Sequence, residues 1–250
     1  MESVSSIAVW SRRVAIAGLV LFVLGPVLSQ AGAPPELGFR MFGLGGVLLA
    51  FVAVILGAIG LFVTRASTGR GGRGLARSGA LLGLVLLGVT LTTAAVSSVS
   101  KGGAAALPPI NDITTSPGDP PAFAKIAALG ANAGRDMGYP GAEFAEQQRA
   151  AYPDLGPISL SVPPGKAFQQ CRDTASALGW EIVDQDPMSG RIEASDSTAI
   201  FRFVDDVVIR LRPGPGGGTI VDVRSKSRDG RGDLGANAGR IRAFREALGS

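Results

Sequence analysis

The stretch Gly179–Ala194, GWEIVDQDPMSGRIEA, decides the fold of the second half of this 250-residue chain. Trp180 and Ile182 alternate with polar residues before a turn, and Ile192 continues the alternation after it. The turn itself, Asp186–Gly190, consists of residue types that favour tight turns. A period of two on both sides of such a turn predicts a β-hairpin with one buried face.

The same kind of pattern extends the hairpin into a sheet. Alternating runs predict further strands over residues 158–162, 201–211 and 221–223. Apolar stripes at helical spacing predict helices over 163–178 and 234–248. The order β-α-β-β-β-β-α predicts an α+β domain, in which two helices cover one face of an antiparallel β-sheet.

These patterns also predict the positions of individual side chains. Gly179 should end the first helix, and Asp233 should cap the second, whose apolar stripe starts at Leu234. Four large side chains should share the core: Phe168, Trp180, Phe203 and Ile241. The outer face of the sheet should carry charged residues, with Arg210 opposite Asp222: Glu193, Arg202, Arg210, Arg212, Asp222 and Arg224.

The first hundred residues are much more apolar than this domain. They contain three apolar runs, Val14–Leu28, Met41–Val63 and Gly79–Val99. A helix of about 20 mostly apolar residues crosses a bilayer. The second run meets this length without a charge, and the third does so with its Thr and Ser tail at the interface. The sequence therefore predicts membrane helices ahead of the α+β domain.

The first run has a second interpretation. It is short and contains Pro26, and the pair Arg12 and Arg13 precedes it. The small residues Ala31–Ala33 that follow resemble a signal-peptide cleavage site. We favour an uncleaved helix, with a cleaved signal peptide as the alternative. Both interpretations give the same topology for the rest of the chain.

The distribution of charge predicts that topology. Four arginines and no acid lie between the second and third runs: Arg65, Arg70, Arg73 and Arg77. The positive-inside rule places this loop in the cytoplasm. The N-terminus is then cytoplasmic, and in a bacterium the C-terminal domain is periplasmic, anchored in the inner membrane. The net charge is +6 for residues 1–101 but −2 for residues 102–250, so we expect no nucleic-acid partner.

The chain therefore divides into three parts. Residues 1–100 are the three-helix transmembrane region, 101–121 are a linker rich in Gly, Ala and Pro, and 122–250 are the extracytoplasmic domain. Pairs of small residues four apart, Gly79 with Gly83 and Ala53 with Gly57, let helices approach closely. We expect them to pack this bundle, with a homo-oligomer through these faces as the alternative. No ionisable residue lies in the three runs, which disfavours a transporter.

The heptapeptide LGANAGR occurs twice, at Leu129–Arg135 and at Leu234–Arg240. The second copy opens the last predicted helix, whereas the first lies among turn residues. The flanking sequences differ. We therefore interpret the pair as a chance similarity in a chain with 36 glycines, because a repeat architecture needs repeated units of 20–50 residues.

Several motifs in order resemble the DUF1499 family of bacterial proteins. They are NDITTSPGDPPAF at Asn111–Phe123, YPG at Tyr139–Gly141, AYPD at Ala151–Asp154, the hairpin Gly179–Ala194, FRFVDDVVIRLRP at Phe201–Pro213, and VDVRSKSRDGRGDLGANAGRIRAF at Val221–Phe244. The resemblance covers about Asn111 to Leu248. It implies an α+β domain behind membrane helices, and it implies no activity.

The densest polar stretch, Ser225–Arg240, is the candidate site. Five of its residues could converge near the start of the last helix, where anions are favoured: Arg228, Arg231, Asp233, Asn237 and Arg240. The functional interpretation is a site for an anion or carboxylate. The structural alternative is a capped turn held by salt bridges.

Other candidates for chemistry are weaker. The acid pair Asp205–Asp206 precedes a predicted strand and the pair Asp184/Asp186 approaches a turn, places where acids are common. Cys171 lies on an apolar helix stripe. The chain has one cysteine and no histidine, so it has no internal disulfide and no imidazole base or ligand. We expect no metal and no cofactor.

Two functions follow from these observations. The first is a membrane protein with a non-catalytic periplasmic domain that binds an envelope protein, a lipid or a cell-wall partner. The second is an envelope hydrolase or anion-dependent enzyme that uses the Arg/Asp cluster with carboxylates. The absence of histidine and of a recognised nucleophile favours the first.

Overall fold

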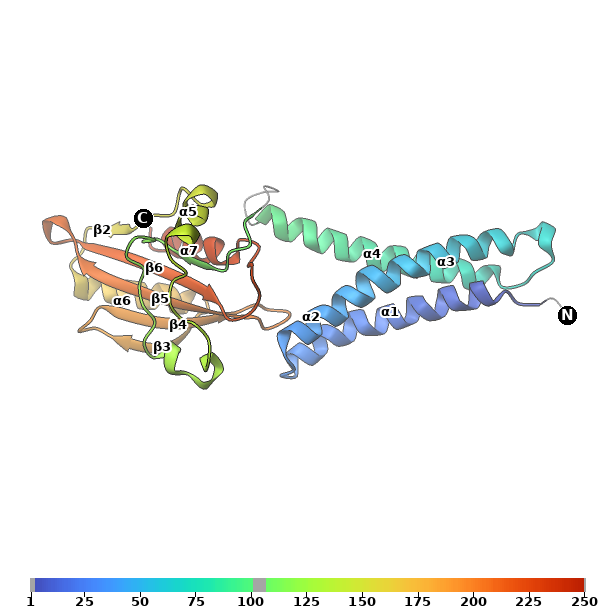
Figure 1. Cartoon of the computed structure of the whole chain (residues 1–250), viewed down its shortest axis with the longest axis horizontal. Coiled ribbons are helices and arrows are strands. Elements are labelled where there is room, and N and C mark those ends of the chain that lie inside the picture. Colours follow the sequence, from blue (N-terminus) through green and yellow to red (C-terminus); the bar gives the residue numbers. More distant parts are fainter. Residues whose placement is uncertain (1–2, 101–106, 250) are drawn as a thin grey trace. The chain divides into compact units, whose positions relative to one another are not determined.

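The computed structural model describes residues 3–100 and 107–249. The described residues form two compact units, one of residues 3–100 with 199–202 and the other of 107–198 with 203–249. The first unit is a helical bundle, and the second is an antiparallel sheet with helices (Figure 1). Each unit is described by itself below.

The helical unit contains the three predicted apolar runs. Its elements are α1 (Ser6–Gln30), α2 (Pro35–Gly43), a π-helical segment (Leu44–Leu49), α3 (Ala50–Val63) and α4 (Arg73–Ser100). The helices from α2 to α3 are continuous. Three stretches are therefore long and apolar enough to span a membrane: Ser6–Gln30, Pro35–Val63 and Arg73–Ala95. The first run is a full-length helix despite Pro26.

Small residues lie where these helices touch one another. A methyl group on Gly83 would lie 2.7 Å from the carbonyl oxygen of Ala50, and one on Gly57 would lie 2.6 Å from Cβ of Ala80. The backbone of α3 therefore approaches α4 too closely for larger side chains. The predicted packing of the bundle by these residues is present within the chain, and the homo-oligomer stays a prediction.

The sheet of the second unit has the strand order β1-β6-β5-β4-β3, and β2 also pairs with β6. All pairings are antiparallel. The strands are β1 (Asp112–Thr114), β2 (Ile158–Leu160), β3 (Glu181–Asp186), β4 (Arg191–Ser197), β5 (Val204–Pro213) and β6 (Thr219–Ser227). Helices α6 (Pro164–Ala177) and α7 (Ala236–Ala247) pack on one face, as the sequence predicted (Figure 1).

The core lies between these helices and the sheet. Phe168, Trp180 and Ile241 belong to it, and Trp180 stacks on Phe244 with ring centres 5.2 Å apart. Gly179 follows α6 with a φ of 85° and ends the helix as predicted. Burial of this apolar cluster stabilises the packing of the two helices on the sheet.

Phe203 does not share this core, so that prediction was wrong. Strand β5 starts only at Val204. The backbone N–H of Thr198 donates to the carbonyl of Phe203 at 2.9 Å, and the N–H of Phe203 donates to the Thr198 hydroxyl at 3.0 Å. These bonds close a loop that also holds Arg202, which has a φ of 61° and is not on the sheet face. The alternation of apolar and polar residues thus extends over residues 201–203 in the sequence, although these residues form a loop and not a strand.

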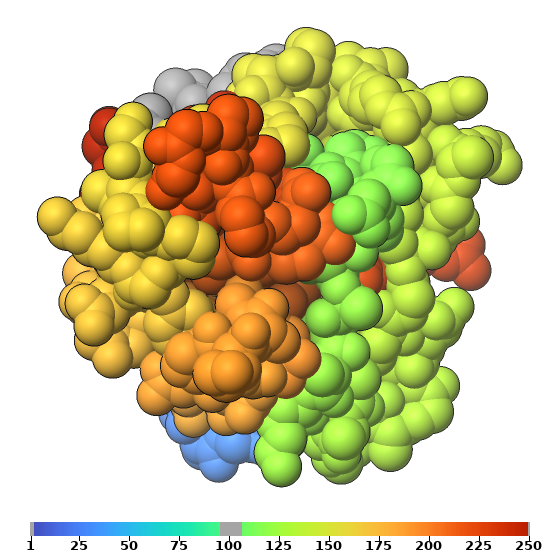
Figure 2. All heavy atoms as spheres, turned by 90° about the vertical axis from the view of Figure 1, so that its left-hand side faces the viewer, coloured from blue at the N-terminus to red at the C-terminus, as the bar shows by residue number. Residues whose placement is uncertain are grey.

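The second face of the sheet is covered rather than exposed. After β1 the chain crosses it as residues 115–141, here called the covering segment (Figure 1). Phe123 and Ile126 of this segment pack against Val208 of β5. In Figure 2 the green atoms of the segment lie directly beside the orange atoms of the sheet hairpins, and Asp119 reaches Arg210 at 2.9 Å.

This cover corrects two expectations. Residues 107–121 are not a linker, because Ile110 and Ile113 lie in the core and β1 pairs with β6. The charged outer face is not open to water either, since Glu193 and Asp222 are fully buried. Both carboxylates of the outer face have partners: Glu193 accepts the N–H groups of the covering segment, and Asp222 lies opposite Arg210 at 2.8 Å, as predicted.

Candidate functional site

Strand β6 presents polar residues to both faces of the sheet near its end. The alternation of side chains along a strand sends Arg224 and Lys226 to the covering segment and Ser225 to the helices. Arg224 is 2% exposed. A buried guanidinium needs a counter-charge and acceptors for its N–H groups, so the covering segment must supply them.

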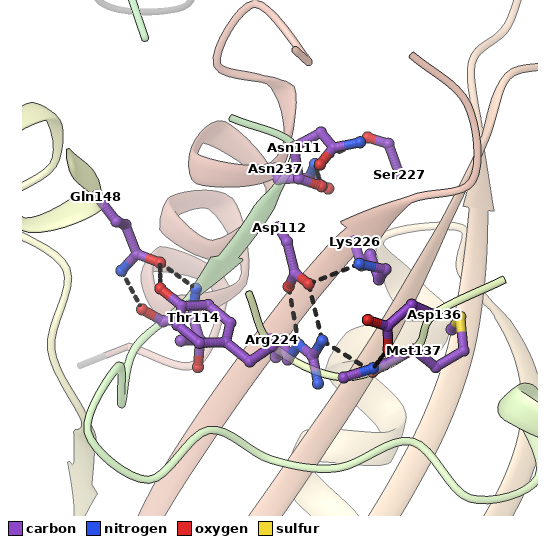
Figure 3. Close-up of polar contacts among 12 residues, drawn as sticks. Asn111, Asp112, Thr114, Asp136, Met137, Gln148, Arg224, Lys226, Ser227 and Asn237 are labelled. Carbon is purple, nitrogen blue, oxygen red and sulfur yellow. Dashed lines mark hydrogen bonds and ion pairs between the residues drawn. The ribbon is translucent and has the colours of Figure 1, made fainter. Parts of the chain in front are cut away.

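Asp112 on β1 supplies the counter-charge (Figure 3). It accepts two hydrogen bonds from Arg224, at 2.8 and 2.7 Å, and one from the Lys226 ammonium at 2.9 Å. The carbonyls of Pro121 and Met137 accept the remaining bonds of Arg224, at 3.1 and 3.0 Å. The geometry is the bidentate arrangement that suits arginine and a carboxylate. Asp112 thus fixes β1 and the covering segment to β6.

Aromatic rings complete the environment of Arg224. Its guanidinium lies 4.9 Å from the ring centre of Phe123 and 5.6 Å from that of Tyr139. Burial, together with the negative charge of Asp112, raises the pKa of Tyr139 to about 12. The Tyr139 hydroxyl donates to Gln148, which also bonds both backbone groups of Thr114. Asp112, Arg224, Tyr139 and Gln148 therefore hold β1 and the covering segment against β6, and we call these four residues the clamp.

A cavity of about 250 Å³ lies beside the clamp, between the covering segment and the ends of β5 and β6. Eight of its nine lining residues are polar or charged, and the ninth is Met137: Asn111, Asn132, Arg135, Asp136, Met137, Asp206, Lys226, Ser227 and Arg228. Three of these residues are basic and two are acidic. Residues far apart in the sequence form this cavity, because β1 and β6 pair.

Asn132 is one of the lining residues, and its side-chain oxygen is a buried acceptor without a partner in the described chain. Its side-chain NH₂ donates to the carbonyl of Ile126 at 3.0 Å and to Asp206 at 2.9 Å. Its carbonyl oxygen, Oδ1, is buried and has no hydrogen-bond partner among the described residues. Leaving a buried polar atom unpaired costs about 1–3 kcal/mol.

Arg228 borders the same cavity and is held firmly. Its Nε and Nη2 donate to the two oxygens of Asp206, at 2.9 and 2.7 Å, and Nη2 also donates to the Ser195 hydroxyl at 3.2 Å. Hydrogen bonds to Asp206 raise the pKa of Arg228 above its ordinary value. Its Nη1 makes no hydrogen bond within residues 3–100 and 107–249, so these donors remain available in a fixed position.

The five predicted site residues do not form one site. Arg228 lies at the cavity, whereas Arg240 lies on the helix face and pairs with Asp205 and Asp196, at 2.7 and 2.8 Å. Asn237 joins Arg240 at 2.8 Å. Consecutive residues of a strand point to opposite faces, so Asp205 and Asp206 draw the two arginines apart.

The other two predicted residues have different surroundings. Asp233 accepts the backbone N–H groups of Gly235 and Asn237, at 2.8 and 2.7 Å, and so satisfies the start of α7 as predicted, although the N-cap residue itself is Gly235. Helix α7 starts only at Ala236, and Leu234 is 73% exposed with a φ of 52° instead of facing the core. Arg231 is exposed and has no side-chain hydrogen bond or ion pair in the described parts of the chain.

The two LGANAGR copies differ in structure. The first contains a 3₁₀ turn (Gly130–Asn132) and the second opens α7. Their asparagines are both buried, however. Asn132 binds Asp206 on one face of β5, and Asn237 joins the network of Asp205 on the other. The same amide chemistry thus serves opposite sides of the sheet.

The weaker candidates have structural partners. Asp184 pairs with Arg191 at 3.3 Å, and Asp186 accepts hydrogen bonds from the turn residues Met188 and Ser189. Burial raises the pKa of the Cys171 thiol to about 12, which disfavours its thiolate. Asp205 and Asp206 face apart, so they cannot share a ligand.

Seven of the nine lining residues were not candidates in the sequence analysis: Asn111, Asn132, Arg135, Asp136, Met137, Lys226 and Ser227. The first lay in the supposed linker, and the second lay in the heptapeptide that we dismissed. Arg224 lies in a predicted strand and would need a counter-charge if buried, and Asp112 could supply it. This need could have indicated that the supposed linker is part of the folded domain. No signal in one sequence predicts which backbone carbonyls close the cavity.

Residues 112–248 match the sequence profile of a family described as "Protein of unknown function (DUF1499)". The match covers more than half of the chain and includes β1, the covering segment, the whole sheet and α7. No curated protein sequence matches the chain. The three helices that could span a membrane precede the matched residues. The chain therefore belongs to the DUF1499 family and carries three candidate membrane helices ahead of the family domain.

Proposed function

We propose that this chain is a membrane-anchored, non-catalytic binding protein, and that the cavity between the covering segment and the ends of β5 and β6 captures a small polar ligand. The observation that carries the proposal is a cavity bordered by Arg135, Lys226 and Arg228, of which Arg135 and Arg228 each keep an Nη1 group without a hydrogen bond in the described residues. Small-molecule sites commonly combine a concave surface with a few fixed polar groups.

The cavity is preorganised for binding. Asp206 fixes both Arg228 and Asn132, and Asp112 fixes Lys226. Groups held in this way lose little conformational entropy when a ligand binds. The arrangement therefore supports recognition more than it supports chemistry.

The residues of the cavity favour binding over catalysis. The chain has no histidine, and the Ser227 hydroxyl accepts a hydrogen bond from Asn237 rather than facing a base. The alternative enzyme would use the Arg/Asp cluster of Ser225–Arg240, but Arg228 and Arg240 are paired on opposite faces of the sheet. A hydrolase of this kind would need a nucleophilic side chain with a general base within hydrogen-bonding distance of it.

The surroundings of the ligand follow from the topology that we propose. Arg65 and Arg70 lie between α3 and α4, and Arg73 and Arg77 lie at the start of α4. We place these four arginines in the cytoplasm, so the domain after α4 lies outside it. In a bacterium the domain would face the periplasm from the inner membrane. The ligands within its reach are then lipid headgroups, cell-wall fragments and small envelope metabolites.

A ligand screen on the full chain in detergent tests the proposal. A ligand at 100 times its Kd should stabilise the fold by about 2.7 kcal/mol, which gives a clear shift in Tm. Arg135→Ala, at the rim of the cavity, should abolish the shift. Arg231→Ala is the matched control, because it removes an exposed arginine with no side-chain partner in the described chain. Equal shifts in both variants would contradict the cavity as the site.

A further inference from the structure

Another cavity lies in the helical unit, between the end of α3 and the start of α4. It measures about 620 Å³, and its lining residues are Thr64, Arg65, Ala66, Gly69, Arg70, Gly71, Gly72 and Arg73. We infer that this cavity, here called the arginine cavity, binds the phosphate group of an anionic phospholipid. The inference concerns a different site from the one proposed above and does not depend on it.

The charge of the lining residues is entirely positive. Three of them are arginines and none is an acid. Arg65 lies over the ring of Phe62, 4.4 Å from its centre, and Arg73 donates to the carbonyl of Leu61 at 3.4 Å. Arg70 has no side-chain partner in the described part of the chain. A phosphate would supply the missing counter-charge together with several acceptor oxygens, which suit guanidinium groups.

The rest of the helical unit does not balance this charge. Glu36 is the only acid among its described residues. It lies near the start of the continuous stretch Pro35–Val63, and a rise of about 1.5 Å per residue puts it about 40 Å from Val63. That separation is several Debye lengths at physiological ionic strength. Arg73 also begins α4, a helix of 28 residues whose N-terminal end adds positive potential.

The arginine cavity lies at a bilayer surface in either orientation of the chain. One candidate span ends at Val63 and the next begins at Arg73, so the lining residues connect two spans. Residues in this position lie where the hydrocarbon core gives way to the lipid headgroups. Basic residues there are attracted to anionic lipids, and basic cavities between membrane helices are known sites for their headgroups.

Apolar side chains beside the cavity favour a lipid over a free phosphate. Phe62, in the last turn of α3, is 64% exposed, and Val4, which forms a β-bridge with Gly71, is 57% exposed. A phospholipid can place its phosphate against the arginines and the first part of an acyl chain against Phe62. Inorganic phosphate makes only the first of these contacts.

The loop that forms the cavity is held in place by the N-terminal segment. The backbone N–H of Ser5 donates to the carbonyl of Gly71 at 3.1 Å, and the N–H of Gly71 donates to the carbonyl of Ser3 at 3.3 Å. Within the loop, the Thr68 hydroxyl donates to the carbonyl of Arg65 at 2.7 Å. A loop fixed in this way loses less conformational entropy when it binds a headgroup.

The test measures lipid binding to the full chain in detergent by native mass spectrometry. The lipids are dioleoyl phosphatidylglycerol and dioleoyl phosphatidylcholine, which have the same acyl chains. We expect phosphatidylglycerol to bind at least about fivefold more tightly, because the choline cation of the other lipid is repelled by the arginines. Inorganic phosphate at the same concentration should not displace phosphatidylglycerol.

Single variants assign this preference to the cavity. Arg70→Gln should lower the affinity for phosphatidylglycerol by about fivefold and leave that for phosphatidylcholine unchanged. The fold should be preserved, because Arg70 is exposed, and the Tm of the variant checks this. Arg77→Gln is the matched control, since Arg77 is an exposed arginine of the same basic stretch that does not line the cavity. Its effect should be less than about twofold.

Three results would overturn the inference. Equal affinity for the two lipids would show that the cavity does not select an anion. Equal losses in Arg70→Gln and Arg77→Gln would show that the positive charge acts diffusely and not through the cavity. Displacement of the lipid by inorganic phosphate would show a phosphate site that makes no use of the acyl chain. None of these results affects the cavity of the second unit, because its screen relies on Arg135 and Arg231.

Discussion

Asp112 balances the buried Arg224 and the partly buried Lys226 from a position that is itself fully buried. Removing one member of a buried ion pair leaves an uncompensated charge, which costs about 3–5 kcal/mol. We therefore expect Asp112→Asn to lower the free energy of unfolding by about 3–5 kcal/mol, measured by chemical denaturation. It should also loosen the covering segment, because Arg224 holds Pro121 and Met137 by hydrogen bonds.

Asp119 provides the matched control for that change. It also pairs with an arginine, Arg210, at 2.9 Å, but its side chain is 70% exposed. Exposed pairs contribute at most about 1 kcal/mol. A loss for Asp119→Asn as large as that for Asp112→Asn would mean that burial does not determine the strength of these pairs.

Tyr139 makes the stability of the domain sensitive to alkaline pH. Burial and the charge of Asp112 raise its pKa from 10 to about 12. The raised pKa means that the folded state keeps the phenol neutral while the unfolded state ionises. The contribution of Tyr139 is therefore complete below pH 10 and is lost as the pH rises from 10 to 12.

Denaturation at a series of pH values from 9 to 12 measures this loss. We expect the stability of the wild-type chain to fall more steeply than that of Tyr139→Phe, which has no phenol to ionise. The chain has two tyrosines, so absorbance of tyrosinate can be assigned by comparison with the same variant. Parallel stability curves for the two proteins would show that the pKa of Tyr139 is the same in the folded and unfolded states, which would contradict the prediction.

At the scale of elements, β6 and α7 are joined by a segment whose residues serve both faces of the sheet. Asp233 fixes its end, since its carboxylate accepts two backbone N–H groups at the start of α7. Loss of a helix cap costs about 0.5–2 kcal/mol. We expect Asp233→Ala to lower stability by about that amount, as measured by thermal and chemical denaturation.

The neighbouring Arg231→Ala is the control for the cap. Arg231 is exposed and without side-chain partners in the described residues, so its change should stay within about 0.5 kcal/mol. If Asp233→Ala were as neutral as Arg231→Ala, the two hydrogen bonds to Gly235 and Asn237 would contribute nothing to the helix. The cap would then be only a geometric coincidence.

At the scale of the whole molecule, the arginine loop and the three candidate spans predict the orientation of the chain. A reporter that is active only outside the cytoplasm, fused after Ser250, should be active. The same reporter inserted after Gly69, between α3 and α4, should be silent. A reversed pattern would place the family domain in the cytoplasm and would exclude envelope ligands.

The sequence by itself determined the order of the elements from β2 to α7, and it separated the apolar helices from the α+β domain. Apolar runs of sufficient length predicted α1, α3 and α4, and the period-two alternation around Gly179–Ala194 predicted the hairpin of β3 and β4. These features depend on residues that are close in the sequence, so a single sequence is enough to predict them. The cap at Asp233 and the pair Arg210–Asp222 are local in the same sense.

Only the tertiary structure decided what the polar residues do. The supposed linker became β1 and the covering segment, because Asp112 pairs with Arg224 across 112 positions of sequence. Phe203 left the core because strand β5 starts at Val204, three residues later than predicted. Arg228 and Arg240 were divided between two faces by the alternation of Asp205 and Asp206. A cavity depends on which distant groups remain unpaired after folding, and the local periodicity of a sequence does not contain that information.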